Sequence, residues 1–351
     1  MKRLLTITLA IVAIAVSFPQ FATAAGDYKV CWSRYVGWEP WGYIQEKGIM
    51  ARWAKKYGIN VKLVYVDKYD KSLAQFAAKA FDGCAMTNMD ALNVPAAGGV
   101  DSQAIIMGDT SAGNDGVVLM NANTMKDIRG RTVFLVEGSV SHYALARALA
   151  MNGLTLKDVQ LKHVDDSQIG PVFLADKSPR AAIVTWNPML LEVKLRKGAT
   201  SVFNSAQIPG EIMDLMVVHT SAPDALKKAL VGAWYEAMGI MSKPDRAGGE
   251  MVAFMAKASE GTPEMYKAQL RTTQMFYRPE QGIAFTIDPK IKSIMELVRK
   301  FSFEAGLMGD GVKSINQIGI QFADGSVLGD QKNTKLRFDT SYMKLVAEGK
   351  L

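Results

Sequence analysis

The amino-acid sequence predicts an α/β protein with two lobes, each a mainly parallel sheet flanked by helices. Segments with the period of strands alternate with segments of helical periodicity, and this alternation restarts near residue 131. Alternating strands and helices favour parallel sheets with right-handed crossovers. The length of 351 residues is also enough for two domains.

The first run of elements is bounded by turn residues. Its predicted strands are residues 27–35, 60–66, 83–87, 103–109 and 116–120, and its predicted helices are 41–56, 69–81 and a third that begins at Asn88. In the first helix Trp41, Ile44, Ile49 and Trp53 lie at roughly helical spacing, and Gly58 ends it.

The second run repeats the pattern. Its predicted strands are 131–137, 159–164, 180–186 and 214–220, and its predicted helices are 138–154, 167–177 and 188–198. Ser139 or Ser141 is the expected N-cap of the first of these helices, and Gly153 its C-terminal stop. After residue 220 the chain is mostly helical and rich in methionine, and its 20 Met residues most simply fill the core.

Extended segments near residues 115 and 217 join the two runs, so the second run is predicted to be inserted into the first. We expect lobe 1 to comprise residues 25–117 and 218–351, and lobe 2 to comprise 118–217. A hinge is expected near Gly116–Met120 and Met216–His219. In open parallel sheets ligands bind beyond the carboxyl ends of the strands, which predicts a site between the lobes.

The first 24 residues have the features of a secretory signal. Lys2 and Arg3 precede an apolar run that is too short for a comfortable membrane span, and the run ends in Ala22-Thr23-Ala24. We expect cleavage after Ala24 and an exported mature protein. An uncleaved membrane anchor is the alternative.

Charge and cysteine content argue against several classes of function. The net charge is +7, or +5 without Lys2 and Arg3, and the positive charges are scattered, so nucleic-acid binding is not expected. Cys31 and Cys84 either form a disulfide, which an oxidising compartment permits, or remain two buried thiols. The three histidines lack the spacing of metal ligands, so no metal or cofactor is expected.

The predicted strand ends carry many more acidic than basic side chains. Seven acids stand there against one basic residue, Arg34: Glu39, Asp90, Asp109, Asp115, Glu137, Glu211 and Asp214. Such a site would repel an anion, whereas carboxylates accept N–H hydrogen bonds and indole rings attract cations. Guanidinium, which is planar with donors around its edge, suits aromatic stacking combined with edge carboxylates.

Residues 33–49 crowd four aromatic side chains onto a turn broken by glycine and proline, which is unlike a core strand. We therefore expect Trp38 and Trp41 to face the ligand, with packing in the core as the alternative. The candidate ligand-binding residues are Trp38, Trp41, Asn88, Asp90, Asp115, Glu137, Ser139, His142, Trp186, Asn187 and Asp214.

Several candidates also have a structural interpretation. Asp90 can cap the helix that begins near Met89, and Asp115 with Gly116 can form a turn. Glu137 follows an apolar strand and precedes a helix, where a carboxylate has little use in packing, so binding is favoured. Trp53 is expected in the core.

The chain resembles the periplasmic solute-binding proteins of nitrate/sulfonate/taurine-type ABC transporters over nearly all of its mature length. The resemblance is carried by the Trp-Pro-aromatic turn at 38–43 and by the segments FDGCAMTNMDAL, GSVSHYALARALAMNGLTLKDVQL and AAIVTWNPML. It implies the type II periplasmic-binding-protein fold with a ligand cleft between the lobes. The segments TNMDALNVPAAGGVDS and GNDGVV look closer to a subgroup linked with urea-carboxylase-type enzymes, which implies urea or guanidine as the ligand.

The resemblance implies a non-catalytic, monomeric binding protein that closes on a small nitrogenous solute. It would deliver the solute to an inner-membrane permease and its ATPase. The alternatives are binding of taurine, a sulfonate or nitrate by the same fold, a ligand sensor, and an enzyme similar to thiamin-precursor synthases. Those synthases carry a cysteine-rich motif and require iron, whereas this chain has two separated cysteines, so no catalytic residue is expected.

Overall fold

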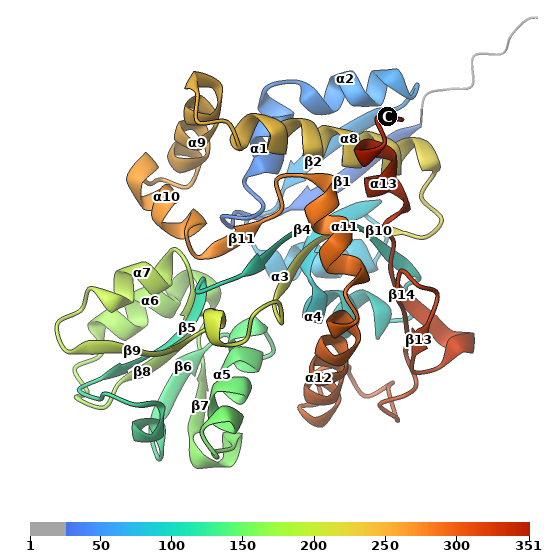
Figure 1. Cartoon of the computed structure of the whole chain (residues 1–351). Helices are drawn as coiled ribbons and strands as arrows, with labels where there is room; N and C mark the ends of the chain where they lie inside the picture. Colours follow the sequence, from blue (N-terminus) through green and yellow to red (C-terminus); the bar gives the residue numbers. More distant parts are fainter. Residues whose placement is uncertain (1–25) are drawn as a thin grey trace, which may run out of the picture.

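The computed structural model describes residues 26–351, which form two β-sheets covered by helices (Figure 1). The predicted signal segment, residues 1–24, lies outside the described residues. The predicted α/β fold class is confirmed, and the two sheets belong to two lobes. In Figure 1 the smaller sheet and its helices, coloured green, lie at the lower left.

The larger sheet combines the start of the chain with its C-terminal part. In the described chain its order is β13-β12-β14-β4-β10-β3-β1-β2, and β11 pairs with β4 outside this path. Pairs β1–β2, β1–β3, β4–β14 and β12–β14 are parallel, whereas β10 runs antiparallel between β3 and β4. Its strands are β1 (Asp27–Trp32), β2 (Asn60–Tyr65), β3 (Gly83–Thr87), β4 (Ser102–Ser111), β10 (Met213–His219), β11 (Thr273–Met275), β12 (Gly319–Gln321), β13 (Val327–Leu328) and β14 (Thr334–Phe338).

The smaller sheet has the order β7-β6-β8-β5-β9. Strand β6 pairs in parallel with β7 and β8, and β5 runs antiparallel to both β8 and β9. Its strands are β5 (Asp115–Met120), β6 (Thr132–Leu135), β7 (Gln160–His163), β8 (Ala182–Trp186) and β9 (Ala199–Asn204).

The helices cover the sheets. Helix α8 packs against α1, α2, α9 and α13 in the larger lobe, and α6 packs against α7 in the smaller one. The helices are α1 (Pro40–Glu46), α2 (Ile49–Lys56), α3 (Tyr69–Ala77), α4 (Asn88–Ala91), α5 (Val140–Met151), α6 (Asp166–Ala175), α7 (Met189–Lys194), α8 (Asp224–Met241), α9 (Arg246–Ala258), α10 (Pro263–Leu270), α11 (Pro279–Ile287), α12 (Lys290–Glu304) and α13 (Ser341–Ala347).

Some predicted elements differ from the structure for local reasons. The predicted helix 41–56 is two helices, because Gly48 adopts a left-handed φ of +64° between them. The helix that starts at Asn88 continues as a π-helical turn, Leu92–Ala96, which contains Pro95. Strand β9 and the strands after residue 220 were not predicted, since the latter have two to five residues, too few to display a period.

The chain passes between the two sheets twice. It leaves β4 at Ser111 and enters β5 at Asp115, and it returns between the end of β9 at Asn204 and the start of β10 at Met213. The segments 116–120 and 216–219, where a hinge is expected, lie inside β5 and β10 and are hydrogen-bonded to neighbouring strands. The crossing segments are 112–114 and 205–212.

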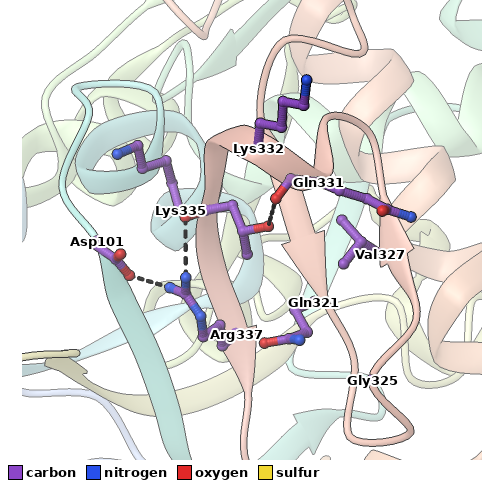
Figure 2. A pocket seen from close by; sticks show the side chains of 9 residues that line it. Asp101, Gln321, Gly325, Val327, Gln331, Lys332, Lys335 and Arg337 are labelled. Carbon is purple, nitrogen blue, oxygen red and sulfur yellow. Dashed lines mark hydrogen bonds and ion pairs between the residues drawn. The ribbon is translucent and has the colours of Figure 1, made fainter.

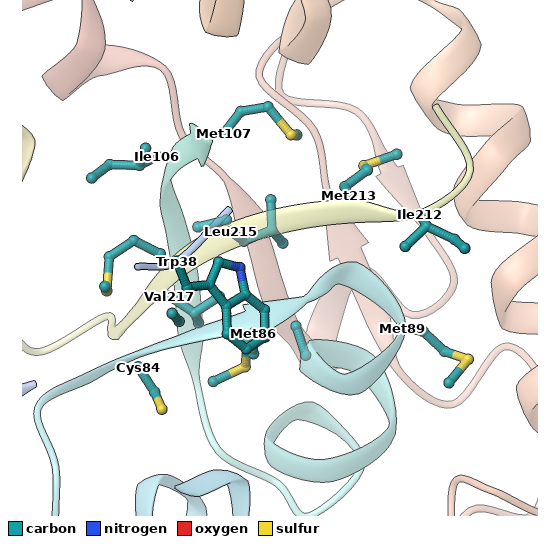
Figure 3. Close-up of a cluster of buried hydrophobic side chains, with 14 of the residues drawn as sticks. Trp38, Cys84, Met86, Met89, Ile106, Met107, Ile212, Met213, Leu215 and Val217 are labelled. Atoms are coloured by element: carbon teal, nitrogen blue, oxygen red, sulfur yellow. The ribbon is translucent and has the colours of Figure 1, made fainter. Parts of the chain in front are cut away.

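Methionine contributes strongly to the core, as predicted. Met86, Met89, Met107 and Met213 are almost completely buried where β3, β4, α4 and β10 meet (Figure 3). The same view shows the indole of Trp38 beside this cluster.

The two cysteines form a disulfide. Cys31 on β1 and Cys84 on β3 are partners in the parallel register, with Cα atoms 4.4 Å apart. Of the two possibilities that the sequence left open, the bridge is therefore the correct one. It joins strands from two separate segments of the larger lobe and lies in the core, where both residues are fully buried.

Candidate functional site

A small cavity lies in the larger lobe, at the end of β4 and the beginning of β10. Its volume is about 10 Å³, roughly the space that one water molecule needs, so its walls must move apart before a solute of several atoms can enter. Its polar lining consists of two carboxylates, and the remainder is mainly aromatic and apolar. The lining residues are Gly37, Trp38, Trp41, Ile106, Gly108, Asp109, Asp214, Leu215, Met216 and Trp234.

The aromatic wall comes from the turn between β1 and α1. Pro40 occupies the first position of α1, where its fixed φ favours the helical start, so the chain turns sharply after Trp38. Trp41 packs on Trp234 of α8 with ring centroids 4.9 Å apart. The predicted Trp38 and Trp41 therefore line the cavity, and they are also almost completely buried.

Glycine at position 37 lets this turn approach β4 closely. A Cβ at Gly37 would lie 2.3 Å from Oδ2 of Asp109, which is far inside van der Waals contact. The clash would be with the carboxylate of Asp109, which faces the cavity. The absence of a side chain at Gly37 therefore lets the Trp38 turn lie close to this carboxylate.

Asp109 and Asp214 form a pair of neighbouring carboxyl groups. They are register partners on the antiparallel strands β4 and β10. Asp109 is 1% exposed, and apart from the carboxyl of Asp214 no described residue donates a hydrogen bond to either of its oxygens. Burial raises the pKa of Asp109 to about 7. Burial, the charge of Asp109 and a hydrogen bond to it raise the pKa of Asp214 well above its usual range.

Two further acids extend this pair. Asp115, at the start of β5, accepts a 2.5 Å hydrogen bond from Ser111 Oγ, while its Oδ1 has no partner, and burial raises its pKa to about 6. Asp90 accepts hydrogen bonds of 2.7 Å from the hydroxyls of Tyr69 and Thr87. We call Asp90, Asp109, Asp115 and Asp214 the carboxylate cluster.

The carboxylate cluster has no cationic partner in the described chain. The ion pairs of residues 26–351 include none of its four members. The charges of Asp109, Asp115 and Asp90 all act on Asp214 and raise its pKa. Buried carboxylates without a counter-charge are costly, so this region favours a positively charged guest over a negatively charged one.

The smaller lobe meets the larger one through an aromatic cluster, defined as Tyr35, Trp38, Tyr69 and Trp186. The ring of Tyr35 lies 5.2 Å from Trp38, 5.8 Å from Tyr69 and 5.9 Å from Trp186 of β8. The Tyr35 hydroxyl also donates a 2.7 Å hydrogen bond to Asp166, the first residue of α6. One tyrosine thus contacts both lobes beside the carboxylate cluster.

Asn187 also lies where the lobes meet. Its Nδ2 donates a 3.0 Å hydrogen bond to Thr272 Oγ1, and its Oδ1 is buried without a partner. The indole N–H of Trp186 is likewise unpartnered. The predicted Trp186 and Asn187 are thus near the predicted Asp115, since Trp186 is the register partner of Asp115.

Four other candidates lie apart from the cavity lining. Asn88 bonds the backbone at Glu211 and Met213, so both ends of its amide are occupied in bracing β10. Ser139 caps α5 by accepting from the N–H of Ser141. His142 packs edge-on against Phe301, and burial lowers its pKa. The side chain of Glu137 is exposed. Solvent can therefore satisfy its charge, so its place between a strand and a helix does not by itself require a ligand.

Several residues near the cavity were not selected from sequence. The sequence did indicate Asp109, which is one of the seven acidic residues at the predicted strand ends. Tyr35 stood in the aromatic turn but not among the candidates. Trp234, Tyr69 and Asp166 gave no signal, because each lies on a helix whose pattern is explained by packing.

A second, open pocket lies beside β14 and is lined mainly by β12, β13 and the segment that leads into β14, together with Asp101 just before β4 (Figure 2). Its arginine, Arg337, is already ion-paired with Asp101, and Lys332 points into solvent. Because its main cation is neutralised and its rim is exposed, this pocket is the weaker candidate.

The two-lobed α/β architecture is the periplasmic-binding-protein fold. The chain belongs to the NMT1/THI5-like family, whose model matches residues 53–284. No curated protein matches the sequence. In the described chain no helix is long and apolar enough to cross a membrane.

Solved structures similar to this chain include sulfonate-binding and nitrate-binding proteins. The alkanesulfonate-binding protein of Xanthomonas axonopodis pv. citri, bound to MOPS, is 15% identical with a TM-score of 0.64, covering 83% of this chain and 96% of its own. A putative sulfonate-binding protein of Methylobacillus flagellatus KT is 13% identical with a TM-score of 0.67, covering 93% and 96%. The nitrate-binding protein of Synechocystis PCC 6803 is 13% identical with a TM-score of 0.53, covering 91% and 98%.

Proposed function

We propose that this protein is the periplasmic substrate-binding component of an ABC importer and captures a small nitrogenous solute, guanidine or a urea-like molecule. The observation that carries the proposal is the Asp109 carboxylate, which is buried beside Asp214, faces a small cavity walled by tryptophans and lacks an external partner. N–H groups on the edge of a planar solute would supply the missing hydrogen bonds, and the indoles would hold its faces.

Binding of a sulfonate or nitrate is the alternative that the sulfonate and nitrate relatives suggest. Those proteins are at most 15% identical to this chain, so the likeness concerns the fold and not the ligand. An anion in this cavity would meet Asp109 and Asp214 with no neighbouring Lys or Arg to offset them in the described chain. The charge therefore supports a cation or a neutral donor-rich solute.

An enzyme resembling the thiamin-precursor synthases is the second alternative. Both cysteines are joined in one buried disulfide, so neither is available as an iron ligand or a nucleophile. The residues that line the cavity are of types that can bind a solute. We therefore propose that the protein binds its solute without converting it.

The proposed site uses both lobes. Trp38, Trp41 and Asp214, together with Asp109, would hold the solute in the larger lobe, while Asp90 would orient Tyr69. The smaller lobe would close on it with Trp186, Asn187 and the Asp115 region. We place the hinge in the crossing segments 112–114 and 205–212, where the chain passes between sheets. Asn88, Glu137, Ser139 and His142 are left out of the site.

The closed, monomeric form would be recognised by an inner-membrane permease that works with an ATPase. The predicted signal segment would place the mature protein in the periplasm. A ligand sensor that docks on a receptor domain would close in the same way. Identifying the partner, a permease or a receptor, would distinguish a transporter component from a sensor.

Calorimetric titration of the mature protein tests the proposal. The panel is guanidinium, acetamidinium, urea, taurine and nitrate, with Asp109→Asn as the test variant and the exposed Asp27→Asn as its matched control. We expect a nitrogenous solute to bind to the parent and to Asp27→Asn, and to lose at least about tenfold in affinity with Asp109→Asn. Tight binding of taurine or nitrate without a response to guanidinium or urea would refute it.

A further inference from the structure

The Asp109–Asp214 pair has a consequence for which solute the cavity accepts. The two carboxyl groups are register partners, Asp109 is almost completely buried, and both border the same small cavity. Two adjacent carboxylates with no cation nearby do not both ionise; one holds a proton and donates it to the other.

We propose that the pair exchanges this proton for a planar monocation, so that guanidinium or a small amidinium is the ligand and neutral urea is not. The inference rests on the proposed binding function and selects between the two solutes left there. Without ligand, one protonated and one ionised carboxyl give the pair a charge of −1. With guanidinium bound between two carboxylates the charge is again −1, and one proton leaves to solvent for each cation bound.

This exchange keeps the buried charge constant, which is why it selects a cation. Urea would leave the proton in place and bring no charge, so it would find one ionised carboxylate instead of two and would form no ion pair with it. A doubly charged metal ion bound between two carboxylates would change the charge of the pair from −1 to 0, and it would lack N–H donors for the buried Asp109 oxygens.

The other titratable groups around the Asp109–Asp214 pair are not expected to supply the exchanged proton. Asp115 and Asp90 face Asp214 from β5 and α4, and each accepts a hydrogen bond from a hydroxyl. The phenols of Tyr69, Tyr266 and Tyr277 face the pair from α3, α10 and the segment after β11, and their pKa values are raised, so they stay neutral.

Glu39, in the adjoining turn, is the remaining acid nearby and differs in having a partner. Its pKa is raised to about 7 by burial, yet Arg34 Nε lies 2.9 Å from its Oε1, and Ser259 donates to the same oxygen. Glu39 therefore titrates in the same pH range as Asp109, but it is already paired with Arg34. Its substitution is a matched control for proton release on guanidinium binding.

The test is titration of the mature protein with guanidinium chloride in two buffers of different ionisation enthalpy, from pH 5 to pH 8.5. At pH 8, above the pKa of about 7 of Asp109, we expect close to one proton released per guanidinium, and more at pH 6, where both carboxyl groups hold protons; Kd should fall as pH rises. Glu39→Gln should release the same number of protons. Asp109→Asn should release almost none, and thermal unfolding would verify that this variant folds.

The outcomes separate the two proposals. Guanidinium binding with no proton release and a pH-independent Kd would overturn the exchange and leave the binding function in place. Urea that binds as tightly as guanidinium would overturn the selection for a cation. No binding of any nitrogenous solute, together with sulfonate or nitrate binding, would overturn the proposed function itself.

Discussion

At the scale of single residues, Asp109 is placed for binding at the expense of stability. Its folded-state pKa of about 7, like that of about 6 for Asp115, lies above the unfolded value of about 4. Between these values the folded protein holds more protons than the unfolded chain, so the free energy of unfolding falls as pH rises. We expect the ligand-free protein to melt several degrees lower at pH 8 than at pH 5.

The variant Asp109→Asn tests the same point without ligand. Because it removes one of two adjacent buried charges, it should melt higher than the parent at pH 8 and show a flatter dependence of Tm on pH. Scanning calorimetry at pH 5, 6, 7 and 8 measures this, with Asp27→Asn as the exposed control. A parent that gains stability steadily from pH 5 to pH 8 would contradict the assignment.

Gly37 gives a second prediction at this scale. A methyl group there would lie 2.3 Å from Asp109 Oδ2, so Gly37→Ala should displace the Trp38 turn or the carboxylate and weaken guanidinium binding at least about tenfold. Gly249→Ala is the matched control, since its Cβ would meet nothing within 4 Å. Equal Kd values for the two variants would show that the turn does not set the cavity.

At the scale of elements, the disulfide ties β1 to β3 beneath the site. Cys31 and Cys84 are 53 residues apart, and the bond restricts the unfolded chain across that loop. Cys31→Ala/Cys84→Ala should lower the free energy of unfolding by about 2 to 4 kcal/mol. Thermal unfolding is the suitable measurement, because guanidinium and urea are both candidate ligands. An unchanged Tm would mean that packing alone fixes these strands.

The larger elements could be predicted from sequence, and the reasons are local. Helix α8 has a long amphipathic pattern and β3 a buried apolar run, so each shows its period. The break at Gly48 and the two-residue strand β13 depend on one backbone angle and on tertiary pairing, which no period displays.

The residues of the candidate site likewise divide into those that the sequence predicts and those that only the packing of the fold reveals. Trp38, Trp41 and Asp214 are at strand ends, where the α/β topology predicts a site, and they line the cavity. Trp234 could not be predicted, because it reaches the cavity from a helix nearly 200 residues after Trp41, and only the packing of α8 on α1 brings it there. The exposure of Glu137 could not be predicted either, because the sequence does not show how its side chain lies relative to the rest of the fold.

At the scale of the whole molecule, the two crossing segments are bonded to each other. Ser111 Oγ and Ser205 Oγ lie 2.6 Å apart, and the N–H of Gly113 donates to the same Ser205 oxygen. Ser111 also donates to Asp115, a member of the carboxylate cluster. Both crossings therefore meet beside the charged groups, which puts the segments that we propose as the hinge next to the carboxylate cluster.

Closure of the lobes should depend on Tyr35. Its hydroxyl donates to Asp166 in the smaller lobe, so Tyr35→Phe removes an interlobe hydrogen bond to a carboxylate and keeps the ring among Trp38, Tyr69 and Trp186. A bond of this kind contributes about 1.5 to 3 kcal/mol. We expect guanidinium to bind about tenfold more weakly, chiefly through faster dissociation, and small-angle scattering of the saturated variant to show a larger open fraction. The control is Tyr65→Phe, whose hydroxyl makes the same kind of bond, 2.8 Å to Asp67, within one lobe. If both variants bind and close like the parent, the Tyr35–Asp166 contact does not stabilise the closed form.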